Sequence, residues 1–271
     1  MKLFTTALRK ANTAQIRLRR WSYQRLAPHA STTPVFIMGC ARSGSSVTMD
    51  LFAHSLDADV YQQVDRRAFQ NHVLRPEAAL RELFDKSRAA VAVLKPMHEN
   101  QHAQRYLDAF PNLKIIWLLR AYGDGVNSCV RRWNTMRGNL QAIAAGKADV
   151  GWWGEGLCVH QLDMIRQHYH PEMSEASAYA LFWYIRHYFY FHLGLDEIAN
   201  VRVFRYETLV SEPESGVKDL FEFCGCPYKP AYARILHASS VRKHSHPEID
   251  PEIEALCQDM TLRFDQHLVT L

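Results

Sequence analysis

Short apolar runs alternate with amphipathic segments along most of the chain. Four runs are rich in β-branched and aromatic residues, as buried strands are, and they span residues 32–39, 89–95, 113–120 and 200–206. The segments between and after them have helical spacing, at residues 46–56, 99–110, 125–136, 174–193, 213–225 and 250–264. Strands that alternate with helices predict an α/β fold, with a parallel sheet flanked by helices. Because no linker is evident, we expect one domain over residues 31–271.

The N-terminus differs from this pattern by its charge. Residues 1–25 carry seven basic side chains and no acid, namely Lys2, Arg9, Lys10, Arg17, Arg19, Arg20 and Arg25. We predict a basic helical arm over residues 1–30. The arm could contact an anionic membrane surface or nucleic acid. We favour a helix packed on its own domain with Leu8, Leu18 and Trp21 inward, expect no nucleic-acid partner, and leave peripheral membrane contact open.

A second departure is the segment of residues 134–160, which is small, polar and rich in glycine. It predicts a lid or a loop that faces an acceptor. Trp152 and Trp153 within it are candidates for acceptor contact, because stacking suits sugars and flat rings. The aromatic residues of 179–192 are instead interpreted as core.

Composition narrows the class of protein. The 271 residues are 48% hydrophobic and 22% charged, which is typical of a soluble globular protein. No apolar run approaches the roughly 20 residues that span a bilayer, and the N-terminus shows no signal-peptide core. Six scattered cysteines indicate reduced thiols rather than a disulfide framework or a zinc site. We therefore expect a cytoplasmic protein, with its oligomeric state open.

The clearest chemical signal lies in residues 34–52, which nearly match the phosphate-binding frame G-x-x-x-x-G-K-[ST]. Gly39, Gly44 and Ser46 fit the frame, but Ser45 stands where the lysine belongs. The strand over residues 113–120 ends in Arg120, where a magnesium-binding carboxylate would be expected. These changes favour a phosphate-bearing ligand of lower charge than a triphosphate, held without a metal.

Arg42, the loop amides and the loop hydroxyls are the candidates for holding that ligand. A second anion site is expected at Arg120, with Ser128 in the helix that follows and Arg132 one turn beyond it on the same face. Two anion sites at the carboxyl ends of adjacent parallel strands suit a nucleotide with phosphates at both ends.

The segments "GCARSGSS" and "LLRAYGDGVNSCVRRW" resemble the two cofactor-binding segments of sulfotransferases that use 3′-phosphoadenylyl sulfate (PAPS). The resemblance is to the group with tyrosyl-protein, carbohydrate and bacterial small-molecule enzymes, and it covers most of residues 34–245. It implies a bacterial enzyme that transfers sulfonate to a hydroxyl or amine of a carbohydrate, lipid or small molecule, and releases 3′-phosphoadenosine 5′-phosphate (PAP). Ala41 stands where proline is common in the family, and "RAYGDG" stands where a sequence like "RDPRD" is common.

The resemblance also assigns residues. It places Arg42, Ser43, Gly44, Ser45 and Ser46 at the 5′-phosphosulfate, Arg120, Ser128 and Arg132 at the 3′-phosphate, and Tyr206 near the adenine. Ser239 or Ser240, with Lys243, resembles the family's loop over the cofactor. Lys95 matches the lysine that relatives use at the transferred sulfonate.

The proton acceptor is less defined. Asp65 lies about as far beyond the loop as the catalytic carboxylate of the tyrosyl-protein enzymes, and an ion pair with a neighbouring arginine is the alternative for it. His98 and Glu99 are rivals. Two other functions stay open: a P-loop kinase that uses Mg-ATP, with Glu207 as its metal-binding carboxylate, and a non-catalytic nucleotide-binding protein.

Overall fold

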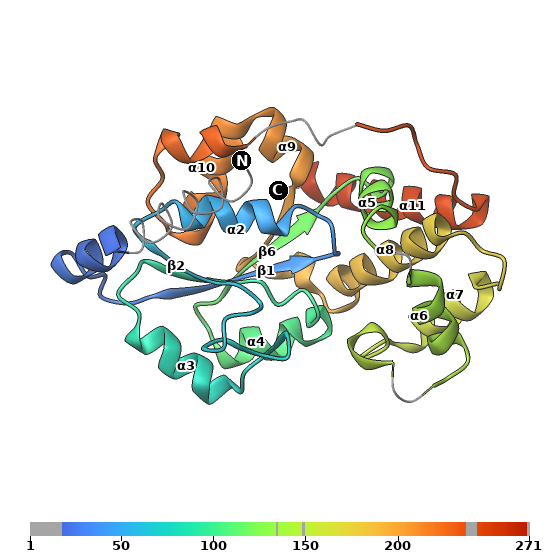
Figure 1. The fold of residues 1–271 in the computed structure, drawn as a ribbon, viewed down its shortest axis with the longest axis horizontal. Helices are drawn as coiled ribbons and strands as arrows, with labels where there is room; N and C mark the ends of the chain where they lie inside the picture. Colours follow the sequence, from blue (N-terminus) through green and yellow to red (C-terminus); the bar gives the residue numbers. More distant parts are fainter. Residues whose placement is uncertain (1–17, 134, 148–149, 237–242, 270–271) are drawn as a thin grey trace, which may run out of the picture.

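The computed structural model describes residues 18–133, 135–147, 150–236 and 243–269. Its centre is a five-stranded sheet in the order β2-β5-β1-β6-β7 (Figure 1). The strands are β1 (Thr33–Gly39), β2 (Ala58–Tyr61), β5 (Val91–Leu94), β6 (Lys114–Leu119) and β7 (Val201–Arg205). Every pairing in this sheet is parallel, with Phe36 opposite Leu94 and Gly39 opposite Leu118. The predicted α/β fold with a parallel sheet is confirmed.

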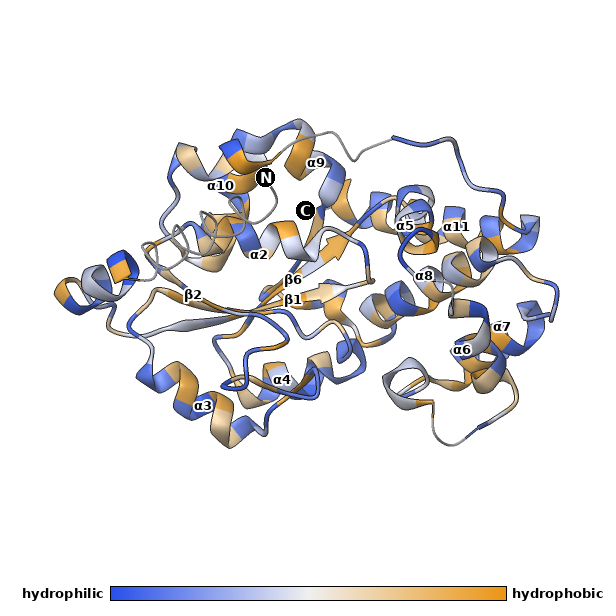
Figure 2. Ribbon diagram, viewed as in Figure 1, coloured by the Kyte–Doolittle hydropathy of each residue, from blue (hydrophilic) through white to orange (hydrophobic). Residues whose placement is uncertain are grey.

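Helices cover both faces of the sheet. They are α2 (Ser45–Ala53), α3 (Glu77–Lys86), α4 (Ala103–Ala109), α5 (Tyr122–Val130), α6 (Met136–Ala144), α7 (Val159–His168), α8 (Glu175–His192), α9 (Tyr206–Ser211), α10 (Pro213–Cys224) and α11 (Pro251–Val269). The central strands β1 and β6 are largely hydrophobic (Figure 2). Apolar side chains alternate along β1 between two separate cores. Val35 and Ile37 pack with α2, α9 and α10. Phe36 and Met38 pack in the core that includes α3, α4, α8 and α11.

This arrangement gathers the ends of the strands that carry chemistry. In a parallel sheet the carboxyl ends of all strands lie on the same side. Ligands bind on that side, next to the strand from which the chain continues to opposite sides of the sheet. β1 is the central strand, between β5 and β6. The segments after β1, β5, β6 and β7 begin at Cys40, Lys95, Arg120 and Tyr206.

Part of residues 134–160 is helical, so the prediction of a loop is wrong there. Met136, Leu140 and Ile143 are buried on one side of α6. Their spacing of four and three residues is helical and was visible in the sequence. Beyond them a short 3₁₀ turn, Gly151–Trp153, precedes α7.

Residues 18–26 are helical and contact the domain through polar side chains. Arg20 donates to the carbonyl oxygens of Ala53 and Ser55, at 2.5 and 3.2 Å. Leu18 is 65% exposed and Trp21 is 57% exposed, so the prediction that they point inward is wrong. Leu8 lies outside the described residues. Within the described part of the chain, no helix combines the length and apolarity needed to cross a membrane.

Candidate active site

The loop between β1 and α2 depends on two glycines. Gly39 has φ +123°, and a Cβ there would lie 2.4 Å from the carbonyl oxygen of Leu118 on β6. Gly44 has φ +96°, and a Cβ there would lie 2.2 Å from the ring of Tyr206. L-residues with a side chain rarely adopt such φ values. Both positions therefore require glycine, as the phosphate-binding frame predicts.

The start of α2 offers hydrogen-bond donors to an anion. The helix begins after Gly44 with no side-chain cap on its first turn. The first amide groups of a helix have no acceptor within the helix and carry part of its positive dipole. The missing lysine is thus replaced by a neutral but still electropositive cradle.

Two arginines complete this cradle. Arg42 Nε donates to Ser128 Oγ at 2.9 Å, and Arg120 Nη1 donates to the carbonyl oxygen of Arg42 at 3.0 Å. The Arg120 guanidinium lies 4.8 Å from the centre of the Tyr206 ring. The structure therefore brings Arg42 into contact with Arg120, 78 positions later in the sequence, and with Ser128, 86 positions later.

These residues surround a cavity of about 330 Å³, here called the cofactor cavity. Its lining is Arg42, Gly44, Ser45, Ser46, Val47, Arg120, Asp124, Ser128, Arg131, Tyr206, Lys243 and His244. Four of these side chains are arginine or lysine, namely Arg42, Arg120, Arg131 and Lys243, and one is acidic, Asp124. An anionic ligand therefore fits this cavity.

A second cavity, of about 470 Å³, adjoins the first and is here called the acceptor cavity. The two share Arg42, Ser45 and Ser46. The remaining lining residues are Ala41, Gln63, Lys95, Met97, His98, Arg132, Trp133, Thr135, Met136, Trp152 and Trp153. A group that is held at the shared residues can thus be reached from both sides.

Lys95 lies at this junction. Its Nζ donates to Ser46 Oγ at 3.2 Å, which directs the ammonium toward the loop. Burial lowers the pKa of Lys95, the charge of Arg42 lowers it further, and Asp50 opposes the shift. An anion at the junction would stabilise the charged form of Lys95.

A column of three aromatic rings holds His98 in the acceptor cavity. The His98 ring stacks on Trp152 at 4.0 Å, and Trp152 stacks on Trp153 at 3.8 Å. Two rings cannot share one face at these distances, so His98 and Trp153 cover opposite faces of Trp152. Trp152 is therefore occupied as a support for His98 and presents only its edge to an acceptor.

The imidazole of His98 is neutral at physiological pH. Burial lowers its pKa to about 4, and the charges of Arg186, His72 and Lys95 act in the same direction. A neutral imidazole can accept a proton from a hydroxyl group.

Arg186 of α8 supports the same turn from inside the protein. It is 1% exposed, and its Nη2 donates to the carbonyl oxygen of Met97 at 3.2 Å. Its guanidinium also lies 5.5 Å from the Trp152 ring. Arg186 thus links the backbone before His98 to the ring that stacks on His98. Nothing in the sequence distinguishes it from the other residues of a core helix.

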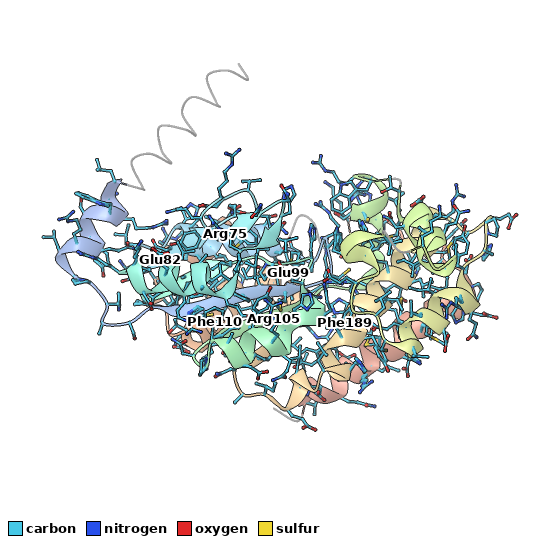
Figure 3. All side chains as sticks on the ribbon, turned by 90° about the horizontal axis from the view of Figure 1, so that it is seen from below. Arg75, Glu82, Glu99, Arg105, Phe110 and Phe189 are labelled. Atoms are coloured by element: carbon cyan, nitrogen blue, oxygen red, sulfur yellow. The ribbon has the colours of Figure 1, made fainter. Side chains whose placement is uncertain are left out.

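Two candidates for the proton acceptor lie elsewhere. Asp65 lines neither cavity, and Arg67 donates to both of its carboxylate oxygens, at 3.0 and 2.7 Å. Glu99, labelled in Figure 3, is 3% exposed. It accepts hydrogen bonds from the amide of Leu74 and from the hydroxyl of Tyr106. Burial raises the pKa of Glu99. Both carboxylates have structural partners.

The end of α5 directs the two arginines that follow it into different cavities. The helix ends at Val130, before the turn that would carry Arg132 on the same face as Ser128. Arg131 lines the cofactor cavity, while Arg132 lines the acceptor cavity. The residue spacing predicted a helix over residues 125–136, and α5 ends at Val130 instead.

The remaining predicted residues are placed as follows. Ser43 is buried, and its hydroxyl has no hydrogen-bond partner among the described residues. Lys243 lines the cofactor cavity, whereas Ser239 and Ser240 lie outside the described residues. Glu207 accepts from the amide of Ala121 at 3.0 Å and lines neither cavity. Within the described residues, no group of three metal-binding side chains could hold an ion.

Comparison with known proteins agrees with this geometry. The family model described as "Sulfotransferase domain" matches residues 32–250. No curated protein is significantly similar to the chain in sequence.

Solved structures of sulfotransferases are similar in fold. A sulfotransferase domain from the curacin biosynthetic pathway has a TM-score of 0.52 at 14% identity, over 86% of this chain and 98% of that chain. A sulfotransferase domain from the Synechococcus PCC 7002 olefin synthase has a TM-score of 0.47 at 13% identity, over 86% and 96%. A sulfotransferase from Mycobacterium avium has a TM-score of 0.45 at 12% identity, over 95% and 81%. Only the first score supports a shared fold.

Proposed function

Because the chain belongs to the sulfotransferase family, we propose that it transfers the sulfonate of PAPS to a hydroxyl or amine of a small-molecule, lipid or carbohydrate acceptor. The observation that carries the proposal is the junction of the two cavities at Arg42, Ser45 and Ser46, with Lys95 beside it. Donor and acceptor would meet there without a metal ion.

The cofactor cavity has a complementary group for each end of the donor. The amides of the loop and of the first turn of α2, with Arg42 and the loop hydroxyls, would hold the 5′-phosphosulfate. Arg120, Ser128 and Arg131 would hold the 3′-phosphate, with Arg131 in the place first given to Arg132. Tyr206 would contact the adenine.

His98 is the proton acceptor that this geometry favours over Asp65 and Glu99. As the acceptor oxygen forms its bond to sulfur, the bond from sulfur to the 5′-phosphate oxygen breaks, and the acceptor's proton passes to His98. Lys95 would stabilise the negative charge that develops on the phosphate oxygen. The products are the sulfated acceptor and PAP.

A kinase remains the second candidate, but its requirements are poorly met. It would need Mg²⁺ and a carboxylate at the end of a strand. Glu207, the residue first considered for this role, instead binds the amide of Ala121 at the start of α5.

Chromatography of the nucleotide tests the proposal. The enzyme would be mixed with PAPS in EDTA, with and without a panel of phenols, sugars and amines. We expect acceptor-dependent formation of PAP that Mg²⁺ does not change. ATP consumption that requires both Mg²⁺ and an acceptor would instead establish a kinase.

The aromatic column makes a separate prediction. In a Trp152→Leu variant, we expect kcat to fall roughly tenfold, because His98 loses its stacking support. Solvent would also reach His98, so the acidic limb of kcat/KM should move up from pH about 4 toward 6.5. Trp133→Leu is the matched control, since Trp133 lines the same cavity but stacks with Arg42. An unchanged acidic limb in Trp152→Leu would refute the supporting role.

A further inference from the structure

A third cavity, of about 490 Å³, continues outward from the acceptor cavity. The two share Gln63, and the His72 ring of the third cavity lies 6.4 Å from the His98 ring. Its other lining residues are Val64, Arg66, Phe69, Gln70, Asn71 and Arg75. An acceptor that reaches His98 can therefore extend into this space.

One wall of the third cavity is a short hairpin with an unusual turn. β3 (Phe69–Gln70) pairs antiparallel with β4 (Val73–Leu74), and Asn71 and His72 form the turn with φ of 51° and 67°. A two-residue turn with both φ positive favours glycine at its second position. His72 occupies that position at a cost in backbone energy. Such an outlier supports a hypothesis of function for the side chain.

The hairpin is anchored to the core and so holds its side chains in place. The amide of Leu74 donates to the buried Glu99 carboxylate, and the amide of Arg75 donates to the carbonyl oxygen of Ala68 at 2.9 Å. Arg75 Nη1 in turn donates to the carbonyl oxygen of Arg66 at 3.2 Å. The side chain of Arg75, labelled in Figure 3, thus lies against the backbone of Arg66.

The charged side chains that line the acceptor cavity and the third cavity are all cationic. The acceptor cavity carries Arg42, Lys95 and Arg132, and the third cavity carries Arg66 and Arg75. Among the described residues, no aspartate or glutamate lines either cavity, and Arg75 interacts with the charge of Glu82, which lies outside both. The field there favours an anion and disfavours a cationic amine.

We propose that the acceptor carries a carboxylate or similar anionic group, which binds at Arg66 and Arg75 while the acceptor's hydroxyl lies at His98. The inference rests on the proposed function and adds the class of acceptor to it. Hydroxyaryl acids and uronic-acid glycosides share this chemistry. The amine acceptors that the sulfonate-transfer reaction would also allow are excluded when they are cationic.

Two matched pairs of probes test the proposal on the complex of the enzyme with PAP. One pair is 6-hydroxy-2-naphthoate and its methyl ester; the other is 4-nitrophenyl glucuronide and 4-nitrophenyl glucoside. Equilibrium binding would be measured at low and high salt. We expect the anionic member of at least one pair to bind roughly tenfold more tightly at low salt, with less difference at high salt. The pair that shows the preference tells whether the anionic group belongs to a hydroxyaryl acid or to a uronic acid.

The variant Arg66→Gln/Arg75→Gln should lose this preference while its affinity for PAP stays unchanged. Arg88→Gln is the control, because Arg88 is exposed and lies before the N-terminal end of β5, whereas the cavities lie at the carboxyl ends of the strands. If PAP fails to bind to the wild type, the proposed function fails. If PAP binds but neither anionic probe is preferred, including the case in which no probe binds, the subsite is refuted and the proposed function stands.

Discussion

Replacing Lys95 by methionine is expected to lower kcat by about 10² to 10³ while PAP still binds. Removing one donor that stabilises developing charge has effects of this size in other enzymes. In the proposed function Lys95 would meet the reacting group at the junction of the cavities, whereas the loop, Arg42 and Arg120 would hold the phosphates. Methionine keeps the volume of the partly buried stem, so folding should change little.

The measurement is single-turnover conversion of PAPS to PAP, with calorimetric PAP affinity beside it. Lys218→Met is the control, because Lys218 is an exposed lysine that pairs with Glu222 on α10. Conversion by Lys95→Met at the wild-type rate would contradict the assigned role. Equal losses of PAP affinity and rate would show that Lys95 binds the nucleotide in the ground state rather than acting in the transfer.

The second large effect is expected at His98. A His98→Gln variant should lose about 10² to 10³ in kcat, because glutamine cannot accept the acceptor's proton. The wild-type kcat/KM should rise with pH through about 4, since His98 is protonated and inactive as a base below its pKa. The variant should lack this limb.

A pH profile of kcat/KM from pH 3.5 to 8 for both proteins provides the test. His102→Gln serves as the control, because His102 is four residues from His98 but pairs with Glu155 and lines neither cavity. An acidic limb that persists in His98→Gln would assign the proton acceptor to another group. Circular dichroism over the same range separates a change in rate from unfolding.

The stability of the fold should also decrease as the pH falls below neutral, over the range in which His98 loses activity as a base. The pKa of His98 in the folded protein lies below the value of the unfolded chain, so the unfolded state binds the additional proton. The stability associated with neutral His98 is therefore present above pH 6.5 and is lost as the pH falls toward 4. The kinetic profile should be confined to the pH range in which both proteins stay folded.

Much of the fold could be predicted because the central strands are almost wholly apolar. Residues 113–120 and 32–39 form β6 and β1 nearly as the pattern indicated. β2 was missed, since it has four residues and includes Asp59. The β3–β4 hairpin was missed because its strands have two residues each and its turn contains no glycine.

The site was predictable where one short segment carries the chemistry. Gly39 to Ser46 follow the phosphate-binding frame, and Arg120 ends a strand whose position beside β1 follows from the parallel sheet. The contacts of Asp65 and Glu99 depended instead on side chains from other segments, Arg67, Leu74 and Tyr106. Trp152 was expected to contact the acceptor, but its stacking between His98 and Trp153 follows from the position of the turn Gly151–Trp153, which residue spacing does not determine.

The most direct test of the central claim is calorimetric titration of the enzyme with PAP and with ATP, each in EDTA and in Mg²⁺. A cradle with serine in place of lysine, and with Arg120 at the end of β6, predicts tight binding of PAP that is independent of the metal, with weak binding of ATP. AMP should bind more weakly than PAP, because it lacks the 3′-phosphate assigned to Arg120, Ser128 and Arg131. Preferential binding of ATP in the presence of Mg²⁺ would contradict the account and return the kinase to first place.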